Sequence, residues 1–152
     1  MDPLIQGILL SLAPLSELRG GMIVAVAQGA NPWLAWIFCT LANLFVSPIV
    51  FLFLSFLHSK LLWMPLYKRT FNYFLENARR KTHKYIERWG YIGLLVFVAI
   101  PLPFSGAYTG TLAAWFFGMK KPKAIAMISL GVVLASLLVF AMIMGWISVN
   151  NL

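Results

Sequence analysis

The sequence predicts an all-α integral membrane protein built from two inverted-topology repeats. Each repeat is a re-entrant helical hairpin followed by one transmembrane helix, and a cytoplasmic amphipathic helix lies between the two repeats. Three observations predict this fold: an apolar composition, a duplicated pattern of helix breaks, and the placement of the basic residues. Of the 152 residues, 61% are hydrophobic and only 11% are charged, whereas a soluble domain carries about 25% charged residues. A chain with so little polar surface is expected in a membrane, and no secretory signal is evident at its start.

A pattern of small residues occurs twice in the chain, 89 residues apart and without a gap. Both copies have spacings of seven, four and four: Pro14, Gly21, Ala25 and Gly29 in the first, and Pro103, Gly110, Ala114 and Gly118 in the second. Small residues are common in membrane helices, so chance competes with duplication as the explanation. The match in register favours duplication, and paired helix breaks in two halves of a membrane protein indicate a transport site.

The lengths of the apolar segments limit the number of membrane crossings. Residues 33–57 and 124–147 can each span a bilayer, which needs about 20 residues. Residues 4–31 and 90–119 are each roughly 30 residues long, or about 45 Å if helical. Because two full crossings need about 60 Å, each of these segments either crosses once or enters the membrane and returns.

The basic residues favour the second possibility. Eight basic and two acidic residues lie between Lys60 and Arg88, and three lysines lie between positions 120 and 123. By the positive-inside rule both groups belong in the cytoplasm, so residues 90–119 enter and return from that side. Residues 4–31 then enter from the outside, and both termini are outside. We therefore expect one membrane domain over 1–152, with repeat 1 at 1–58, a basic segment at 59–89 and repeat 2 at 90–149.

Residues 66–89 carry apolar side chains at helical spacing on one face and basic side chains on the other. Such a helix suits the cytoplasmic headgroup layer, where we expect it to contact membrane lipids. A regulatory or partner-binding role for this helix is the alternative. Nucleic acid is not an expected partner, because no exposed domain with base-stacking aromatic residues is visible.

The hairpin tips are predicted from prolines and glycines. The first tip is placed between Pro14 and Gly21, with Gly20 at the start of the following helix. The second tip is placed around Pro101, Pro103 and Gly106, with the next helix starting near Ala107 and Gly110 close behind. Irregular backbone at membrane depth must be buried in protein or line a wet cavity, so the two tips are expected to face each other and to act as gates. The helix N-termini at the tips favour anions.

Glu17 and Arg19 are the charged residues that fall inside an apolar segment at membrane depth. Intramembrane charges are costly and are candidate functional residues, here for binding a substrate or a proton. Arg19 suits a carboxylate or phosphate group, and Glu17 is a candidate for proton coupling or counter-charge. The alternative is a structural ion pair that stabilises the tip.

The second tip offers hydroxyl groups on Ser105, Tyr108 and Thr109 as further candidates for binding a substrate. Asn43 in the first spanning segment is a lesser candidate, which we expect to bond a carbonyl group of a tip. Pro48 should kink the helix below it.

No catalytic constellation is present, so we expect no enzyme activity, and no metal or other cofactor is predicted. The single Cys39 lies in an apolar run and is interpreted as a small buried residue. His58 and His83 lie far apart in the sequence, with no cysteine or acidic cluster near them.

Several motifs resemble those of the putative small multi-drug export protein family, and the likeness covers nearly the whole chain. They are Ser16-Glu17-Leu18-Arg19-Gly20-Gly21, Ala42-Asn43, Arg88-Trp89-Gly90-Tyr91-Ile92-Gly93-Leu94 and the segment from Phe97 to Gly110 that contains Pro101-Leu102-Pro103. The resemblance implies a relation to DedA proteins, which include lipid scramblases and carriers of polyprenyl-phosphate lipids, paired re-entrant hairpins, and a prokaryotic cytoplasmic (inner) membrane.

The chain departs from these families in three places. Phe104 stands where a glycine is usual, and the segment Met22-Ile23-Val24 lacks the usual proline. The second hairpin lacks the arginines typical of DedA proteins, which weakens any transfer of lipid-phosphate recognition.

The sequence therefore leaves three functional hypotheses. The first is a transporter or lipid translocase that moves a small anionic or amphiphilic substrate through a midplane site between the hairpins, with proton coupling as an option. The second is an antiporter of cationic drugs and protons that uses Glu17, against which Arg19 argues because it would repel a cation. The third is a non-transporting membrane adaptor acting through the amphipathic helix. A homodimer is expected, because two full spans enclose little interior.

Overall fold

A computed structural model describes residues 1–101 and 105–150, and all regular secondary structure within these residues is α-helical. The helices are α1 (Pro3–Ser11), α2 (Glu17–Ala27), α3 (Pro32–Leu44), α4 (Val46–Phe56), α5 (His58–Leu61), α6 (Pro65–Ala99), α7 (Ala107–Phe116) and α8 (Lys121–Asn150). Two helical units, Pro32–Phe56 and Lys121–Val149, are long and apolar enough to cross a membrane. The expected all-α membrane class is therefore confirmed at this level.

The first spanning unit consists of α3 and α4. Asn31 caps its start by accepting hydrogen bonds from the backbone amides of Trp33 and Leu34, at 2.9 and 3.4 Å. The helix is interrupted at Phe45, which is consistent with Pro48, because a proline cannot donate a hydrogen bond to the carbonyl group four residues earlier. Large apolar side chains on α3, α4 and α8 are exposed, as lipid-facing surfaces require: Leu34, Ile37, Phe38, Leu41, Leu52, Leu130, Leu134, Leu138 and Met142.

The first hairpin is formed by α1 and α2, which the turn at 12–16 joins. Pro14 lies in this turn as expected, but Gly20 and Gly21 do not, because α2 begins at Glu17. A Cβ atom on Gly21 would overlap the carbonyl oxygen of Gly7 and the side chain of Ser11. Gly21 therefore lets two helices approach closely, as small residues do in membrane helix pairs, and does not break one.

The second hairpin is formed by the last part of α6 and by α7. α6 joins the amphipathic segment to this hairpin across a kink at Gly90, whose φ of 54° and ψ of −124° are not helical. α7 begins at Ala107, where the sequence predicts it, and Pro101 and Gly106 lie in the preceding connection. Gly110 lies inside α7, where a Cβ atom would meet the side chain of Val98, so it also serves packing and not a break. Pro103 and Phe104 lie outside the described residues.

The duplicated pattern extends from small residues to backbone hydrogen bonds. α2 and α7 both end at a glycine with positive φ, at 94° for Gly29 and 64° for Gly118. Each end carries the six-residue bond of a Schellman cap, from Ala30 N to Ala25 O at 3.0 Å and from Met119 N to Ala114 O at 2.9 Å. The helices that follow begin at Pro32 and Lys121, again 89 residues apart. The two halves therefore share local geometry in register.

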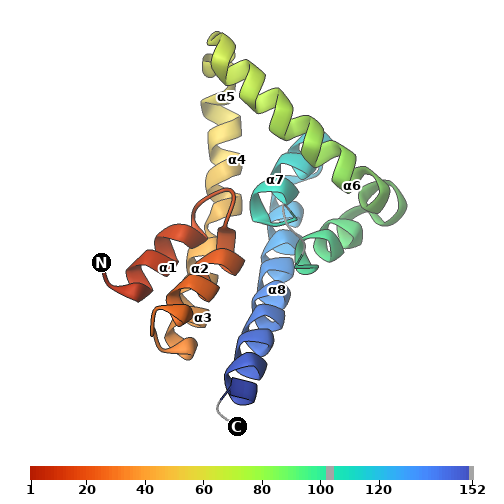
Figure 1. The fold of residues 1–152 in the computed structure, drawn as a ribbon. Helices are drawn as coiled ribbons and strands as arrows, with labels where there is room; N and C mark the ends of the chain where they lie inside the picture. The colour runs from red at the N-terminus through yellow and green to blue at the C-terminus, as the bar shows by residue number, and fades with distance from the viewer. Residues whose placement is uncertain (102–104, 151–152) are drawn as a thin grey trace.

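The two spanning units run in opposite directions, so that the end of α4 and the start of α8 lie at the same end of the molecule (Figure 1). Lys121 Nζ donates a hydrogen bond to Ser55 Oγ at 2.5 Å, which ties these two ends together. The amphipathic part of α6, residues 65–89, extends across this end, while the C-terminus lies at the other. Both basic groups therefore lie at one end of the protein.

The apolar face of residues 65–89 packs partly against the protein. Phe71, Ala78, Thr82 and Ile86 are buried, whereas Trp89 is 58% exposed. The expectation that this face contacts lipid therefore fits only part of the helix, because the neighbouring helices cover the rest.

Candidate functional site

The turn of the first hairpin lies against the helix ends that flank the break in the second hairpin. Hydrogen bonds join residues 12, 17 and 19 of the first hairpin to residues 98, 100, 105 and 108 of the second. Of the residues that the sequence singles out, this junction brings together Glu17, Arg19, Ser105 and Tyr108, with Asn43 beside it. Their expected roles in binding a substrate or a proton remain predictions.

Glu17 contacts the start of α7. Its Oε1 accepts a hydrogen bond from the backbone N–H of Tyr108 at 3.2 Å, and the N–H of Ala107 also bonds its carboxylate. Helix N-termini have unpaired N–H groups and a partial positive charge, which a carboxylate satisfies. Gly106, the N-cap residue of α7, has no side chain to do this, and a Cβ atom on it would overlap the Glu17 carboxylate. Glu17 therefore caps α7 from another hairpin.

The backbone of Glu17 is itself unusual. Its φ is 48°, and Glu17 is the non-glycine residue with positive φ in the described part of the chain. A non-glycine residue in this left-handed region is held there by its surroundings, and such strain often marks a functional position. Its side chain is nearly fully buried, with 9% of the residue exposed.

Arg19 contacts the end of α6, which lies on the other side of the break between α6 and α7. Its Nη2 donates to the carbonyl oxygens of Val98 at 3.3 Å, Ile100 at 3.0 Å and Ser105 at 2.5 Å. Its Nη1 donates to Ser105 Oγ at 3.4 Å. α6 ends at Ala99, so these acceptors include the carbonyl groups that a helix C-terminus leaves unpaired. A cation is the favourable partner for that end of a helix.

Two further side chains, Tyr108 from the second half and Asn43 from α3 of the first half, donate to carbonyl groups at the end of α1 and in the adjoining turn. Tyr108 Oη donates to Leu12 O at 2.5 Å, and Asn43 Nδ2 donates to Ser11 O at 2.9 Å. The latter is the bond to a tip carbonyl expected for Asn43. Tyr108 occupies the position 89 residues after Arg19. The two equivalent positions therefore perform equivalent tasks, each donating to carbonyl groups of the opposite tip.

The space around Glu17 and Arg19 is nearly filled. The cavity beside them measures ≈ 10 Å³ and is bordered by Asn43, Val98 and Val132 among others. A volume of this size holds about one water molecule. In this conformation the two charged side chains therefore contact protein groups and leave no room for a larger ligand.

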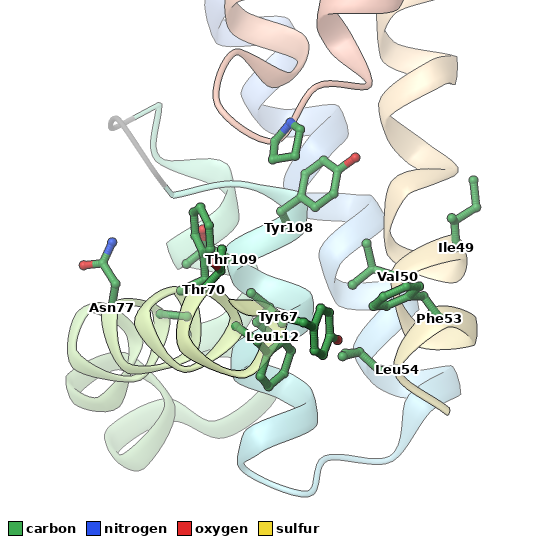
Figure 2. A pocket seen from close by; sticks show the side chains of 14 residues that line it. Ile49, Val50, Phe53, Leu54, Tyr67, Thr70, Asn77, Tyr108, Thr109 and Leu112 are labelled. Atoms are coloured by element: carbon green, nitrogen blue, oxygen red, sulfur yellow. The ribbon is translucent and has the colours of Figure 1, made fainter. Parts of the chain in front are cut away.

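A much larger cavity, of ≈ 410 Å³, lies next to this junction (Figure 2). Tyr108 and Thr109 line it from α7, as do side chains from α4 and from residues 65–89 of α6. Its lining residues in the described part of the chain are uncharged: Pro14, Ile49, Val50, Phe53, Leu54, Tyr67, Thr70, Phe71, Phe74, Asn77, Ala78, Tyr108, Thr109 and Leu112. The volume falls within the range of small-molecule sites, about 300–1,000 Å³. Tyr108 therefore belongs to both regions, because it lines the cavity and also bonds Glu17 and Leu12 at the hairpin junction.

The sequence analysis finds Tyr108 and Thr109 but misses the walls that α4 and α6 contribute. The apolar face of residues 66–89 is expected to contact lipid. Tyr67 and Phe71 on this face are therefore not predicted to line a cavity, although they do. A usable signal is the pair Thr70 and Asn77, two polar residues seven positions apart within that apolar face.

An aromatic cluster that includes the cavity-lining residues Tyr67 and Phe71 lies near the end of α4. The buried His58 lies 3.1 Å from Tyr67 Oη through its Nδ1, and its ring centroid lies 4.2 Å from that of Phe71 and 5.1 Å from that of Trp115. Burial lowers the pKa of His58 and raises the pKa of Tyr67 from their ordinary values, because it disfavours the charged form of each. Both groups are therefore neutral near pH 7.

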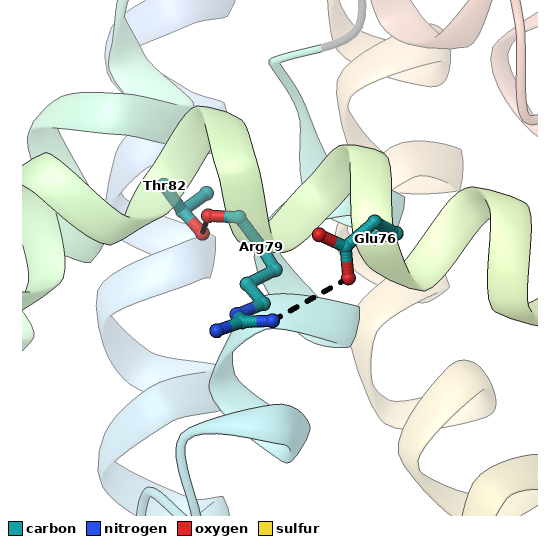
Figure 3. Close-up of polar contacts among 3 residues, drawn as sticks. All are labelled: Glu76, Arg79 and Thr82. Carbon is teal, nitrogen blue, oxygen red and sulfur yellow. Dashed lines mark hydrogen bonds and ion pairs between the residues drawn. The ribbon is translucent and has the colours of Figure 1, made fainter.

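The basic face of α6 makes mostly local contacts. Arg79 pairs with Glu76 at 3.6 Å, and the Thr82 hydroxyl donates to the Arg79 carbonyl oxygen at 3.5 Å (Figure 3). The same hydroxyl donates to the Ala78 carbonyl oxygen at 2.7 Å. The Arg79 guanidinium also lies 5.4 Å from the ring centroid of Phe116 in α7, within cation–π range. Exposed ion pairs of this kind contribute little stability. No cluster of three potential metal ligands occurs among the residues that the structure describes.

Comparison with known proteins gives one match. A family model described as a putative small multi-drug export protein matches residues 17–138, which include α2, the first spanning unit, the second hairpin and most of the second spanning unit. No curated protein and no solved structure matches the chain. The chain is therefore a membrane protein that belongs to the putative small multi-drug export protein family.

Proposed function

We propose that the protein is a transporter that moves an amphiphilic or anionic substrate out through a site between two re-entrant hairpins. The observation that carries this proposal is the ≈ 410 Å³ cavity directly beside the meeting point of the two broken helices. Broken helices beside a binding cavity are the usual construction of secondary transporters.

The charged ends support a proposed orientation in the membrane. Lys121 contacts Ser55, so the lysines of 120–123 lie near the end of α4 that leads into the basic segment. Placing this end in the cytoplasm satisfies the positive-inside rule for both basic groups at once. Each hairpin then enters and leaves the membrane on one side, and both termini lie outside.

The lining of the cavity suggests the chemistry of the substrate. An uncharged, largely apolar wall suits an apolar body, and hydroxyl and amide groups such as Thr70 and Asn77 can orient it. The adjoining turn of α6 also carries the exposed basic residues Lys68 and Arg69. These charges favour an anionic headgroup at the cytoplasmic surface. We therefore propose an amphiphile with an apolar body and an anionic head.

Transport by purified protein in vesicles of phosphatidylethanolamine and phosphatidylglycerol tests this proposal. The probes are the anionic amphiphile 8-anilinonaphthalene-1-sulfonate and the cation ethidium, each with and without a pH gradient. Val50→Trp places a large ring in the cavity, whereas Leu52→Trp places it on the exposed face of the same helix, where Leu52 is 60% exposed. We expect the wild type and Leu52→Trp to transport the anion and Val50→Trp to lose at least about 90% of that activity, equivalent to about 1.4 kcal/mol of barrier.

Other results would change the conclusion. Selective transport of ethidium, lost in Val50→Trp, would favour the cationic-drug antiporter. Absence of transport for both probes by the wild type, together with loss of function in cells when Arg79, Arg80 and Lys84 are replaced, would favour the membrane adaptor.

A further inference from the structure

The break in the second hairpin leaves two helix ends at the hairpin junction. α7 starts after Gly106, which provides no side-chain hydrogen bond, and α6 ends at Ala99 with Ile100 in an extended conformation. Gly106 and Ala107 are buried, and Ile100 is half-buried. Ser105 Oγ donates to Ile100 O at 2.8 Å, but the N–H groups of α7 and the remaining acceptor capacity at the end of α6 are met by charged partners from elsewhere in the protein.

Both partners come from the first hairpin and match the charge of the end that they meet. The Glu17 carboxylate lies on the N–H groups of α7, at the positive end of that helix. The Arg19 guanidinium lies on the carbonyl groups of Val98 and Ile100, at the negative end of α6. One acid and one base, two residues apart, thus hold the two sides of a single break.

We propose that Glu17 and Arg19 are positioning residues, which set the geometry of the second tip from the first hairpin and do not bind the transported molecule. This inference rests on the transport function proposed above, and it defines the role of Glu17 and Arg19 in that function. It explains why the space beside both residues is only ≈ 10 Å³, whereas the cavity of ≈ 410 Å³ has uncharged walls. It also gives a reason for the positive φ of Glu17, because the contact of its carboxylate with α7 helps to hold this unfavourable backbone conformation.

Because Gly106 has no side chain, the carboxylate that caps α7 can be moved from position 17 to position 106 by substitution. In Gly106→Asp the new side chain would overlap the Glu17 carboxylate, so this single variant should be destabilised. In the double variant Glu17→Ala/Gly106→Asp the overlap is gone, and an aspartate at the N-cap position can accept from the amides of α7 directly. The cap is then restored without any acid at position 17.

The experiment compares wild type, Glu17→Ala, Gly106→Asp, the double variant and the surface control Glu76→Ala in unfolding and in anion transport. We expect the unfolding constant to rise about tenfold to a hundredfold in Glu17→Ala, as for loss of a buried cap. We expect the double variant to recover most of this stability and to transport with an unchanged KM. Glu76→Ala, whose glutamate is exposed in an ion pair with Arg79, should match wild type.

A double variant that is stable but does not transport would overturn the proposal, since Glu17 would then act directly on a substrate or proton. Should that variant not fold, Glu17→Gln decides, because a glutamine oxygen can still accept from Tyr108 N. Transport within about tenfold of wild type supports positioning, and abolished transport by folded protein refutes it. If the wild type itself does not transport, the stability measurements still test the capping.

Discussion

Two glycines in apolar helices, Gly21 and Gly145, should respond to alanine in opposite ways. Alanine favours a helix interior over glycine by about 0.5–1 kcal/mol, and this gain applies to both positions. At Gly145 no atom lies within 4 Å of an added Cβ atom, so Gly145→Ala should stabilise the protein by about that amount. At Gly21 the added atom would overlap the backbone of Gly7 and Ser11, which cannot rotate away.

The overlap at Gly21 forces α1 and α2 apart. Overpacking of this kind costs about 1–3 kcal/mol, so the two variants should differ by about 1–3 kcal/mol or more. Reversible unfolding by sodium dodecyl sulfate in dodecyl maltoside micelles, followed by circular dichroism, measures both free energies. Equal stabilisation of the two variants would refute the close approach of the first hairpin's arms and, with it, the packing argument for the small residues of the repeat.

Two further variants test other contacts. Asn43→Leu removes the donor to Ser11 O at 2.9 Å. The free energy of unfolding should fall by about 1–3 kcal/mol because a buried carbonyl group loses its partner. An unchanged midpoint of unfolding would show that this bond does not contribute to stability. Burial lowers the pKa of His58, so the unfolded state binds more protons than the folded state as the pH falls below the ordinary histidine pKa of about 6.5. The stability of wild type should therefore fall from pH 7 toward pH 5, and His58→Gln should reduce this slope; equal slopes would contradict the assignment.

Much of the helical framework follows from the sequence because it depends on local rules. Segment length, proline positions and the left-handed glycines place the spanning helices, the start of α7 and the matched ends of α2 and α7. Gly20 lies three residues inside α2 and not at its start. The positions of Gly21 and Gly110 are misjudged because glycine marks both helix breaks and close helix contacts. Only the neighbouring helix distinguishes these uses.

The site is harder to predict because its partners are backbone atoms. Arg19 is singled out by its charge, but the sequence gives no sign that its acceptors are the carbonyl groups of Val98 and Ile100. The cavity is missed for a related reason. Phe71 has the same apolar character whether it packs against α7 or against lipid, and only the tertiary arrangement decides between them.

The junction between the tips also determines how the two halves recognise each other. Although the backbone repeats in register, Glu17 and Arg19 correspond to Gly106 and Tyr108 at the equivalent positions of the second half. Two copies of the first half would bring like charges together, and two copies of the second half would leave the helix ends uncapped. If the chain is divided in the loop between α5 and α6 and both pieces are produced together, assembly should therefore favour unlike pieces over like ones.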